Sequence, residues 1–357
     1  MSEVKARDAK TVDTGFKDLK SYGREFLTKL LHQMLLIRRF EESAAQMYGL
    51  RKIGGFCHLY NGQEAVGVGS IAALDMTRDY VLTAYRDHGH ALVCGMDPKV
   101  IMAELFGKIT GCSRGKGGSM HMFDLEKHFL GGNGIVGAQI PMATGVAFKQ
   151  MYQKDGGVTV CYFGDGAIHQ GSFHESLNLA AIWKLPIVYI VENNHFGMGT
   201  AVKRVSAVTD FDVKARGYNM PGRTVDGMHV LKVYEAVTEA VKEARESGRP
   251  SLLDIKTYRY KGHSMSDPAK YRTREELDNY KQQDPILLLK ADMLSAKMLT
   301  EDEFTAMDEG IKKVVQDSIS FAESSEEPAL PTLYEDIYVG EGAIARSWEP
   351  GTSGTGV

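Results

Sequence analysis

Two short apolar runs, separated by a helical pattern, stand out near the middle of the chain. Val158–Phe163 is rich in β-branched and aromatic residues and is followed by glycine, which is typical of a buried strand. Apolar residues then recur at helical spacing over Gln170–Trp183, and Pro186 ends that helix before a second apolar run, Ile187–Val191. This order predicts a βαβ unit with parallel strands and a right-handed crossover.

A polar residue with a side-chain oxygen follows each of these strands. Because ligands bind at the carboxyl ends of parallel strands, we expect Asp165 and Asn194 to converge. One carboxylate, one amide and a backbone carbonyl from the following turn would suit Mg²⁺, and the N-terminus of helix Gln170–Trp183 favours an anion. The pattern predicts a Mg²⁺–diphosphate site. The structural alternative makes Asp165 a helix cap and Asn194 a turn residue.

Helical and strand patterns on either side extend this unit. Arg24–Tyr48 has apolar residues every three or four positions, as in a long amphipathic helix. Further helices are predicted over Gln63–Leu74, Pro98–Lys108, Ala138–Tyr152, Val230–Arg245 and, from a capping box at Thr300, to Ala322, and further strands over Val81–Tyr85 and Leu252–Tyr258. Gly111–Met122 is expected as a flexible loop, Thr200–Asp226 as a mixed segment rich in loops, and Arg259–Arg274 as a long loop whose length favours a function.

Composition narrows the class of protein. The 357 residues are 43% hydrophobic, and 42 basic against 46 acidic residues give a net charge of −4, which argues against a nucleic-acid-binding surface. No apolar run has the length of a membrane span. The four cysteines form no C-x-x-C pair, and the N-terminal residues are too acidic for a transit peptide. We expect a cytoplasmic protein, or one of the mitochondrial matrix if it is a processed organelle protein.

Two loop motifs carry weaker signals. Arg86 follows a predicted strand, where its planar fork could bind a diphosphate or pair with Asp87. His88 and His90 alternate in an expected loop, but zinc is rejected because no further ligands cluster nearby. Gly132–Gly137 matches G-x-G-x-x-G without a good preceding strand, so we interpret it as backbone open to a cofactor, with a dinucleotide site as the alternative.

Several longer stretches resemble a known family. The GDG at Gly164–Gly166, followed by Asn193-Asn194, resembles the thiamine diphosphate-binding motif. The stretches GFCHLYNGQEA, AYRDHG, GKGGSMHM, GGNGIVGAQIP, ENNHFGMGT and YRYKGHSMSDPAKYRTREE resemble the alpha subunits of pyruvate dehydrogenase (acetyl-transferring), in the thiamine diphosphate-dependent 2-oxo acid dehydrogenase family. The resemblance extends from about Tyr22 to Leu289.

The resemblance implies a fold and a reaction. The fold would be the α/β thiamine diphosphate-binding fold, a central parallel sheet flanked by helices, with an N-terminal arm and helix (1–50), a cofactor-binding domain (51–290) and a C-terminal helical extension and tail (291–357). The reaction would be oxidative decarboxylation of pyruvate, an oxidoreductase activity, with acetyl transfer to the lipoyl group of dihydrolipoyl transacetylase. A branched-chain 2-oxo acid or acetoin dehydrogenase alpha subunit, or a non-catalytic cofactor-holding subunit, remains an alternative.

The resemblance also implies the site residues, which are named here by their positions in this chain. The catalytic residues would be His58 and His263, and the Mg²⁺ ligands Asp165, Asn194 and the backbone carbonyl of Phe196, where the family usually has tyrosine. Thiamine diphosphate would be lined by Tyr85, Arg86, Gly134, Val136, Asp165, Gly166, Ala167, Asn194 and His263.

Partners follow from the same resemblance. The glutamate that activates the aminopyrimidine ring would come from a beta subunit, in an α₂β₂ heterotetramer that docks on a lipoyl-bearing transacetylase core. In eukaryotic relatives the serines matching Ser264 and Ser266 are phosphorylated, whereas a third such position is Ala201 here. The sequence does not decide whether either serine is modified.

Overall fold

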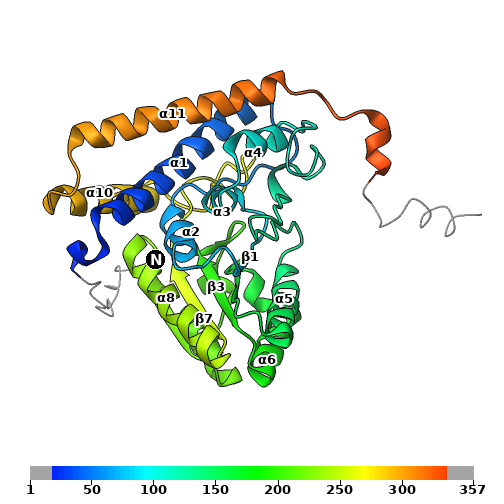
Figure 1. The fold of residues 1–357 in the computed structure, drawn as a ribbon, viewed down its shortest axis with the longest axis vertical. Helices are drawn as coiled ribbons and strands as arrows, with labels where there is room; N and C mark the ends of the chain where they lie inside the picture. Colours follow the sequence, from blue (N-terminus) through cyan, green and yellow to red (C-terminus); the bar gives the residue numbers. More distant parts are fainter. Residues whose placement is uncertain (1–17, 336–357) are drawn as a thin grey trace, which may run out of the picture.

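A single parallel sheet forms the centre of the computed structural model, which describes residues 18–335 (Figure 1). Its five strands run in the order β1, β2, β3, β7, β6, and every pairing is parallel. They span Tyr80–Leu82 (β1), Thr159–Gly164 (β2), Ile187–Asn193 (β3), Ser251–Lys256 (β7) and Gly222–Asp226 (β6). The predicted α/β fold with a central parallel sheet is confirmed.

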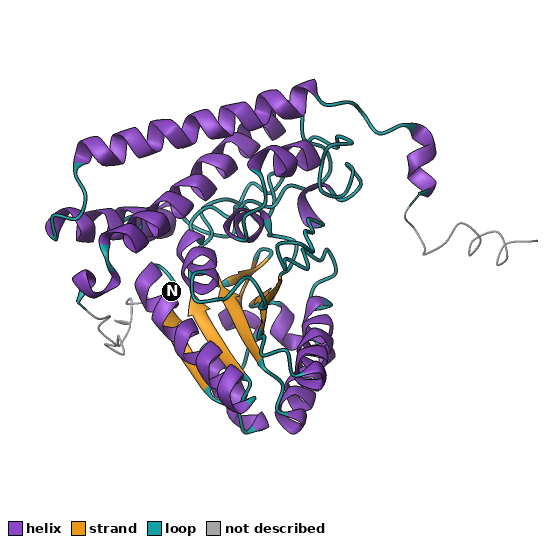
Figure 2. Cartoon of the chain, in the orientation of Figure 1, coloured by secondary structure: helices purple, strands orange, loops and turns teal. Residues whose placement is uncertain are grey.

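Helices cover both faces of the sheet (Figure 2). Alternate side chains of β2 enter two cores, so Val160 and Tyr162 pack with α2 (Glu64–Ile71) and α8 (Val230–Ser247). Cys161 and Phe163 pack on the other face, in the core that includes α5 and α6. These helices span Gln139–Gln153 (α5) and Gly171–Trp183 (α6). Burial on both faces explains why these strands are continuous apolar runs.

A second helical layer lies beyond the sheet. It contains α1 (Arg24–Gly49), α4 (Pro98–Leu105) and α11 (Glu301–Ser324), which pack against one another, and α10 (Pro285–Ser295), which packs on α1 (Figure 1). The predicted capping box of α11 is present, because Thr300 and Glu303 bond reciprocally. The predicted boundary at 290/291 falls within α10. None of the helices in residues 18–335 has the length and apolar character of a membrane span.

Several segments differ from the sequence expectation, and three of them lie in or next to the sheet. β1 ends at Leu82, three residues before the predicted end. β6 lies in a segment expected to be loop, because only Val225 of its residues is buried and no apolar run marks it. His88 and His90 lie in a short helix, α3 (His88–Val93), rather than in a loop. The sequence expectation of a loop failed for His88 and His90 because both imidazoles are buried, and each lies against a carboxylate from a distant part of the chain.

The remaining elements are short. The helical ones are η1 (Leu19–Tyr22), η2 (Gly118–Met120), η3 (Ala167–His169), α7 (Val202–Val205), η4 (Phe211–Tyr218), α9 (Arg274–Lys281) and η5 (Leu330–Tyr334). A two-stranded hairpin pairs β4 (Phe196–Gly197) with β5 (Thr200–Ala201). The part of the expected N-terminal arm before residue 18 and the part of the expected C-terminal tail after residue 335 lie outside the described residues.

Candidate active site

Four adjacent strands end at the same edge of the sheet. Asp165 follows β2 directly and Asn194 follows β3 directly, and the register pairs Gly164 with Glu192. β1 lies on one side of this pair and β7 on the other. The chain beyond β1 leads to Tyr85 and Arg86, and the chain beyond β7 leads to Arg259. Parallel pairing therefore gathers residues from four distant parts of the sequence.

The turns after β2 and β3 pack against each other. A Cβ atom added to Gly166 would lie 3.7 Å from the Cα atom of Gly197, and one added to Gly197 would lie 4.0 Å from Oδ2 of Asp165. Phe196 precedes Gly197, so its backbone lies beside the Asp165 turn. Burial raises the pKa of Asp165 to about 6. A bound cation would favour the ionised carboxylate and lower this pKa.

Asn194 is held by two side chains from other elements. Its Nδ2 donates to Oε1 of Gln63 at 2.8 Å, and its Oδ1 accepts a long bond, 3.5 Å, from Nη1 of Arg259. The amide is buried, so these contacts fix which way it faces. With the nitrogen committed to Gln63, the oxygen is the atom of Asn194 that a cation could use.

Two buried guanidinium groups lack a carboxylate partner. Arg86 donates to the carbonyls of Leu59 and His263 at 2.7 and 2.9 Å. Arg259 donates to Asn194, to the carbonyls of Met198 and Lys261 and to the Tyr271 hydroxyl. Within residues 18–335 every hydrogen bond of these two groups goes to an uncharged oxygen. Burial, followed by the charge of Arg259, lowers the pKa of Arg86 to about 10. This excess positive charge suits an anion.

Three rings form a cluster beside the arginines. The ring centroids of His58 and Tyr85 are 4.6 Å apart, and His263 lies 5.2 Å from His58 and 5.5 Å from Tyr85. Burial, with the charge of Arg86, lowers the pKa of His58 to about 2 and that of His263 to about 4. Both imidazoles are therefore neutral at pH 7. The Nδ1 atoms of both are buried without a hydrogen-bond partner among the described residues, so they can bond to a ligand.

The glycine-rich loop before α5 runs past this edge. A Cβ atom on Gly132 would lie 1.9 Å from Oδ2 of Asp87, and one on Gly137 would lie 3.1 Å from Gln170. The loop therefore connects the segment after β1 with the start of α6. Gly134 packs beside His121 and Val136 is exposed on this loop. No described contact joins Gly134 or Val136 to Asp165, so their role stays a prediction. Ala167 is buried in η3, next to Gly166.

Sequence reasoning missed Arg259 and Gln63 as site residues. The rule that identified Asp165 and Asn194, a polar residue after a parallel strand, also applies to Arg259 after β7. Gln63 gave no comparable signal, because it lies at the start of α2 and reaches the site only through the tertiary fold.

The donor set fits Mg²⁺ and a diphosphate. No group of three or more His, Cys, Asp or Glu side chains in the described ranges could hold a metal ion. A cation bound by Asp165, the Asn194 amide and the Phe196 carbonyl would therefore need further oxygens, and diphosphate and water supply them. Arg86 and Arg259 provide charges that a diphosphate would neutralise.

Comparison with known proteins gives one family and several relatives. The model of the family described as "Dehydrogenase E1 component" matches residues 32–331. A protein of Rhizobium meliloti named "Pyruvate dehydrogenase E1 component subunit alpha" is 52% identical over 320 residues, covering 89% of this chain and 92% of that protein. A protein of the same name from Zymomonas mobilis is 50% identical, and the match covers 89% of this chain and 90% of that protein. Another from Porphyra purpurea is 46% identical, and the match covers 87% of this chain and 92% of that protein.

Proposed function

Because the chain belongs to the dehydrogenase E1 component family, we propose that it is the alpha subunit of a pyruvate dehydrogenase. In this role it supports thiamine diphosphate-dependent oxidative decarboxylation of pyruvate and transfer of the acetyl group to the lipoyl group of a dihydrolipoyl transacetylase. One observation carries the proposal beyond family membership: Arg86 and Arg259 are buried without a carboxylate partner among residues 18–335, beside a carboxylate and an amide at one sheet edge.

The residues divide into a binding part and a proton-handling part. Asp165, Asn194 and the Phe196 carbonyl hold Mg²⁺, and Arg86 and Arg259 neutralise diphosphate oxygens. When bound, the thiazolium ring supplies the nucleophilic carbon and the electron sink. His58 and His263 are neutral, so each can hydrogen-bond to the substrate carboxylate or carbonyl region and accept or return a proton there. Tyr85 limits the room available to both rings.

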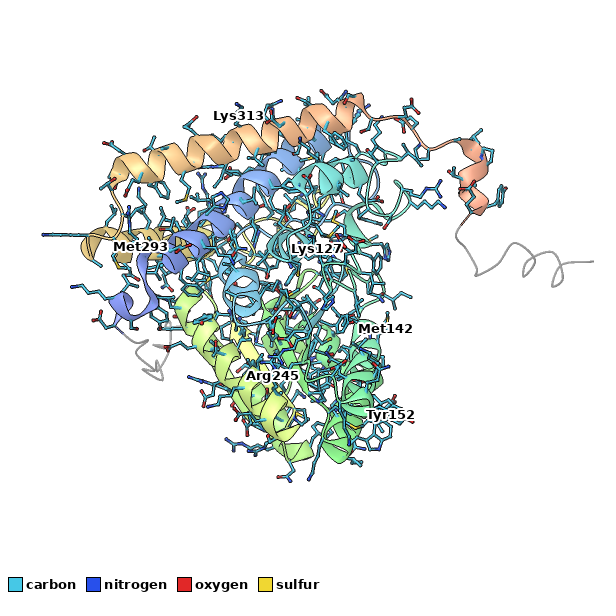
Figure 3. The ribbon with its side chains drawn as sticks, viewed as in Figure 1. Lys127, Met142, Tyr152, Arg245, Met293 and Lys313 are labelled. Carbon is cyan, nitrogen blue, oxygen red and sulfur yellow. The ribbon has the colours of Figure 1, made fainter. Side chains whose placement is uncertain are left out.

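A second subunit completes this site. We propose a beta-type partner in an α₂β₂ assembly, which supplies the glutamate that activates the aminopyrimidine ring. Apolar side chains exposed on α5 and α6 support a contact there. They include Met142 and Tyr152 of α5, which Figure 3 labels, and Ile182 of α6. The four cysteines carry no disulfide, which supports the cytoplasmic location we propose.

The test is pyruvate-dependent reduction of an artificial electron acceptor, with Mg²⁺ and thiamine diphosphate. It compares this chain alone with the chain co-expressed with a beta-type partner. We expect activity only with the partner. Activity from the chain alone would contradict the shared site. If the assembly binds the cofactor but does not turn over pyruvate, the proposed substrate becomes a branched-chain 2-oxo acid or acetoin. The same assay tests each of these in place of pyruvate.

A further inference from the structure

A chain of buried hydrogen bonds leads from α1 to the backbone of His58. Nδ1 of His88 lies 2.9 Å from Oε2 of Glu41, and Nε2 of His88 lies 2.8 Å from Oγ of Ser119. Oγ of Ser119 accepts the backbone N–H of His58 at 3.1 Å. All four residues are at most 5% exposed, so water does not compete for these bonds.

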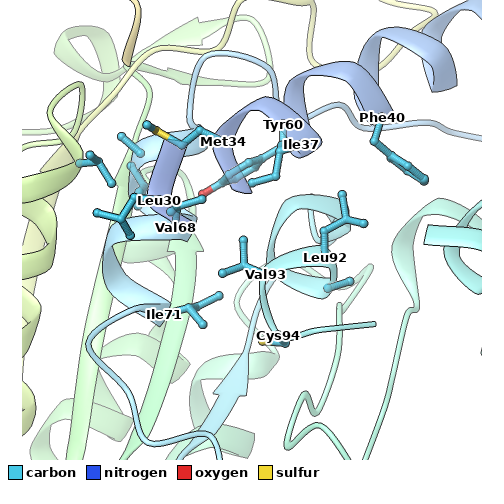
Figure 4. Packing of buried hydrophobic residues seen from close by; sticks show 14 of the residues in the cluster. Leu30, Met34, Ile37, Phe40, Tyr60, Val68, Ile71, Leu92, Val93 and Cys94 are labelled. Carbon is cyan, nitrogen blue, oxygen red and sulfur yellow. The ribbon is translucent and has the colours of Figure 1, made fainter. Parts of the chain in front are cut away.

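Glu41 is the anchor of this chain. It is fully buried on the face of α1 that otherwise contributes apolar residues such as Ile37 and Phe40. A buried carboxylate is costly unless it is paired, and Glu41 uses both oxygens, since Oε1 accepts the backbone N–H of Tyr60 at 2.8 Å. Tyr60 itself lies in the buried cluster with α1 (Figure 4). Glu41 therefore ties both His88 and the segment after His58 to a rigid helix.

The pair of Glu41 and His88 is electrostatically coupled. Burial alone would lower the pKa of His88, but the charge and hydrogen bond of Glu41, together with the charge of Asp87 and a bond to the Ser119 backbone, outweigh it, and the pKa is raised. The coupling keeps the imidazole directed along the line from Glu41 to Ser119. This is the pattern in which a carboxylate orients a histidine that acts on a third group.

Ser119 is held from its other side by an ordered loop. The carboxylate of Glu104, fully buried, accepts four backbone N–H groups, from Ser113, Gly115, Gly117 and Gly118, at 2.8 to 3.0 Å. These bonds fix the segment that enters η2, where Ser119 lies. Ser119 is thus placed by two separate elements, and its hydroxyl reaches His58 from a defined direction.

We propose that Glu41, His88 and Ser119 are positioning residues that hold the His58 backbone, and with it the imidazole, in the orientation needed for proton transfer. This inference rests on the proposed function in one respect, the catalytic role of His58. It adds three residues that are neither proposed metal ligands nor proposed catalytic residues. Ser119 acts through the backbone amide of His58, whereas Glu41 also holds that of Tyr60, so it is the effect of Ser119→Ala that should depend on the presence of the His58 imidazole.

A double-mutant cycle in the co-expressed α–β assembly tests this dependence. We expect Ser119→Ala to lower kcat about tenfold, with KM for pyruvate and Kd for thiamine diphosphate changed less than about twofold. His88→Gln and Glu41→Gln should act in the same direction. In a His58→Ala background, Ser119→Ala should have no further effect on kcat, because the side chain that it orients is gone.

Hydrogen–deuterium exchange gives a readout that does not depend on activity. In Ser119→Ala the peptide containing His58 should exchange faster, because its amide loses the acceptor. Ser318→Ala is the matched control, since Ser318 is fully buried on α11 and its hydroxyl donates to the Val315 carbonyl of the same helix. That variant should leave both kcat and exchange at His58 unchanged.

The outcomes separate the inference from the function on which it rests. If His58→Ala keeps full activity, the catalytic role of His58 is wrong. If His58→Ala is impaired but Ser119→Ala is fully active, or if the two effects multiply in the double variant, the positioning role is wrong and the proposed function stands. Unchanged exchange at His58 in Ser119→Ala would also overturn the positioning role.

Discussion

The ring centroids of His58 and His263 lie 5.2 Å apart and the ring planes meet at 80°, although the two residues come from loops far apart in the sequence. Arg86 joins these loops, because it donates to the carbonyls of both Leu59 and His263. A second link is the backbone bond of 2.9 Å from Met265 N to the Cys57 carbonyl. These bonds hold the two loops together and keep the two imidazoles beside each other.

His263→Gln should lower turnover of pyruvate strongly. Glutamine can keep a hydrogen bond but cannot accept a proton near neutral pH, so we expect kcat to fall roughly 10²-fold or more. The assay is acceptor reduction by the assembly, with Kd for thiamine diphosphate measured in parallel. Unchanged turnover would favour the alternative in which this chain only holds the cofactor. His229→Gln is the matched control, because His229 lies at the start of α8 against Asp292 and belongs neither to the ring cluster nor to the proposed metal ligands.

Arg259 substitutions should separate charge from geometry. Arg259→Lys keeps the positive charge but loses the planar fork, and we expect Kd for thiamine diphosphate to rise about tenfold. Arg259→Gln loses the charge as well and should raise Kd by about 10²-fold. Titration of Mg²⁺–thiamine diphosphate into the assembly measures both. Equal Kd values for the wild type and Arg259→Gln would show that the diphosphate lies elsewhere.

The buried carboxylate of Asp165 should lower the free energy of unfolding when no cation is bound. Burial raises the pKa of Asp165 from 3.8 to about 6, so the folded chain keeps its proton to a higher pH than the unfolded chain does. The free energy of unfolding therefore falls as the pH rises between these two pKa values. A rise of the pKa from 3.8 to about 6 corresponds to a loss of about 3 kcal/mol in the free energy of unfolding above pH 6. Asp165→Asn should therefore raise the thermal unfolding midpoint of the cofactor-free assembly at pH 8, with a smaller gain at pH 5.

The matched comparison for this prediction is Asp278→Asn, since Asp278 is an exposed carboxylate on α9. That variant should unfold as the wild type does at both pH values. A lower midpoint for Asp165→Asn at pH 8 would mean that Asp165 is a structural cap, the alternative that the sequence left open.

Glu104→Gln should destabilise the loop that carries Ser119. The amide nitrogen of glutamine would face backbone N–H groups that the carboxylate now accepts, and loss of such charge-assisted bonds costs about 3 kcal/mol. We expect a lower thermal midpoint and faster hydrogen exchange over residues 113–118. Glu309→Gln, at an exposed position on α11, is the control. Wild-type exchange in Glu104→Gln would contradict this role of the carboxylate.

The central strands of the sheet, and Asp165 and Asn194 as site candidates, could be predicted from the sequence for a physical reason. β2 and β3 are buried on both faces, so their apolar runs were unambiguous, and Asp165 and Asn194 followed from where parallel strands end. β6 and α3 escaped detection, since β6 is mostly exposed and α3 is shorter than two turns. The partners of Glu41 and Glu104 also escaped, because these contacts form only when distant segments pack together.

The pairing of His88 with Glu41 shows the same limit. In the sequence, His88 and His90 alternate in an expected loop, and zinc binding by them was considered and rejected. In the fold each is buried against a carboxylate, Glu41 for His88 and Glu192 for His90. Buried ion pairs between distant residues leave no periodic signal, so only tertiary structure identifies them.

The central claim is that the edge formed by β1, β2, β3 and β7 binds Mg²⁺ and a diphosphate. Its most direct test is calorimetric titration of thiamine diphosphate into the α–β assembly, with and without Mg²⁺, for the wild type and Asp165→Ala. The account predicts tight binding that requires Mg²⁺ in the wild type and a loss of about 10²-fold or more in Asp165→Ala. Equal, Mg²⁺-independent binding by both proteins would contradict it.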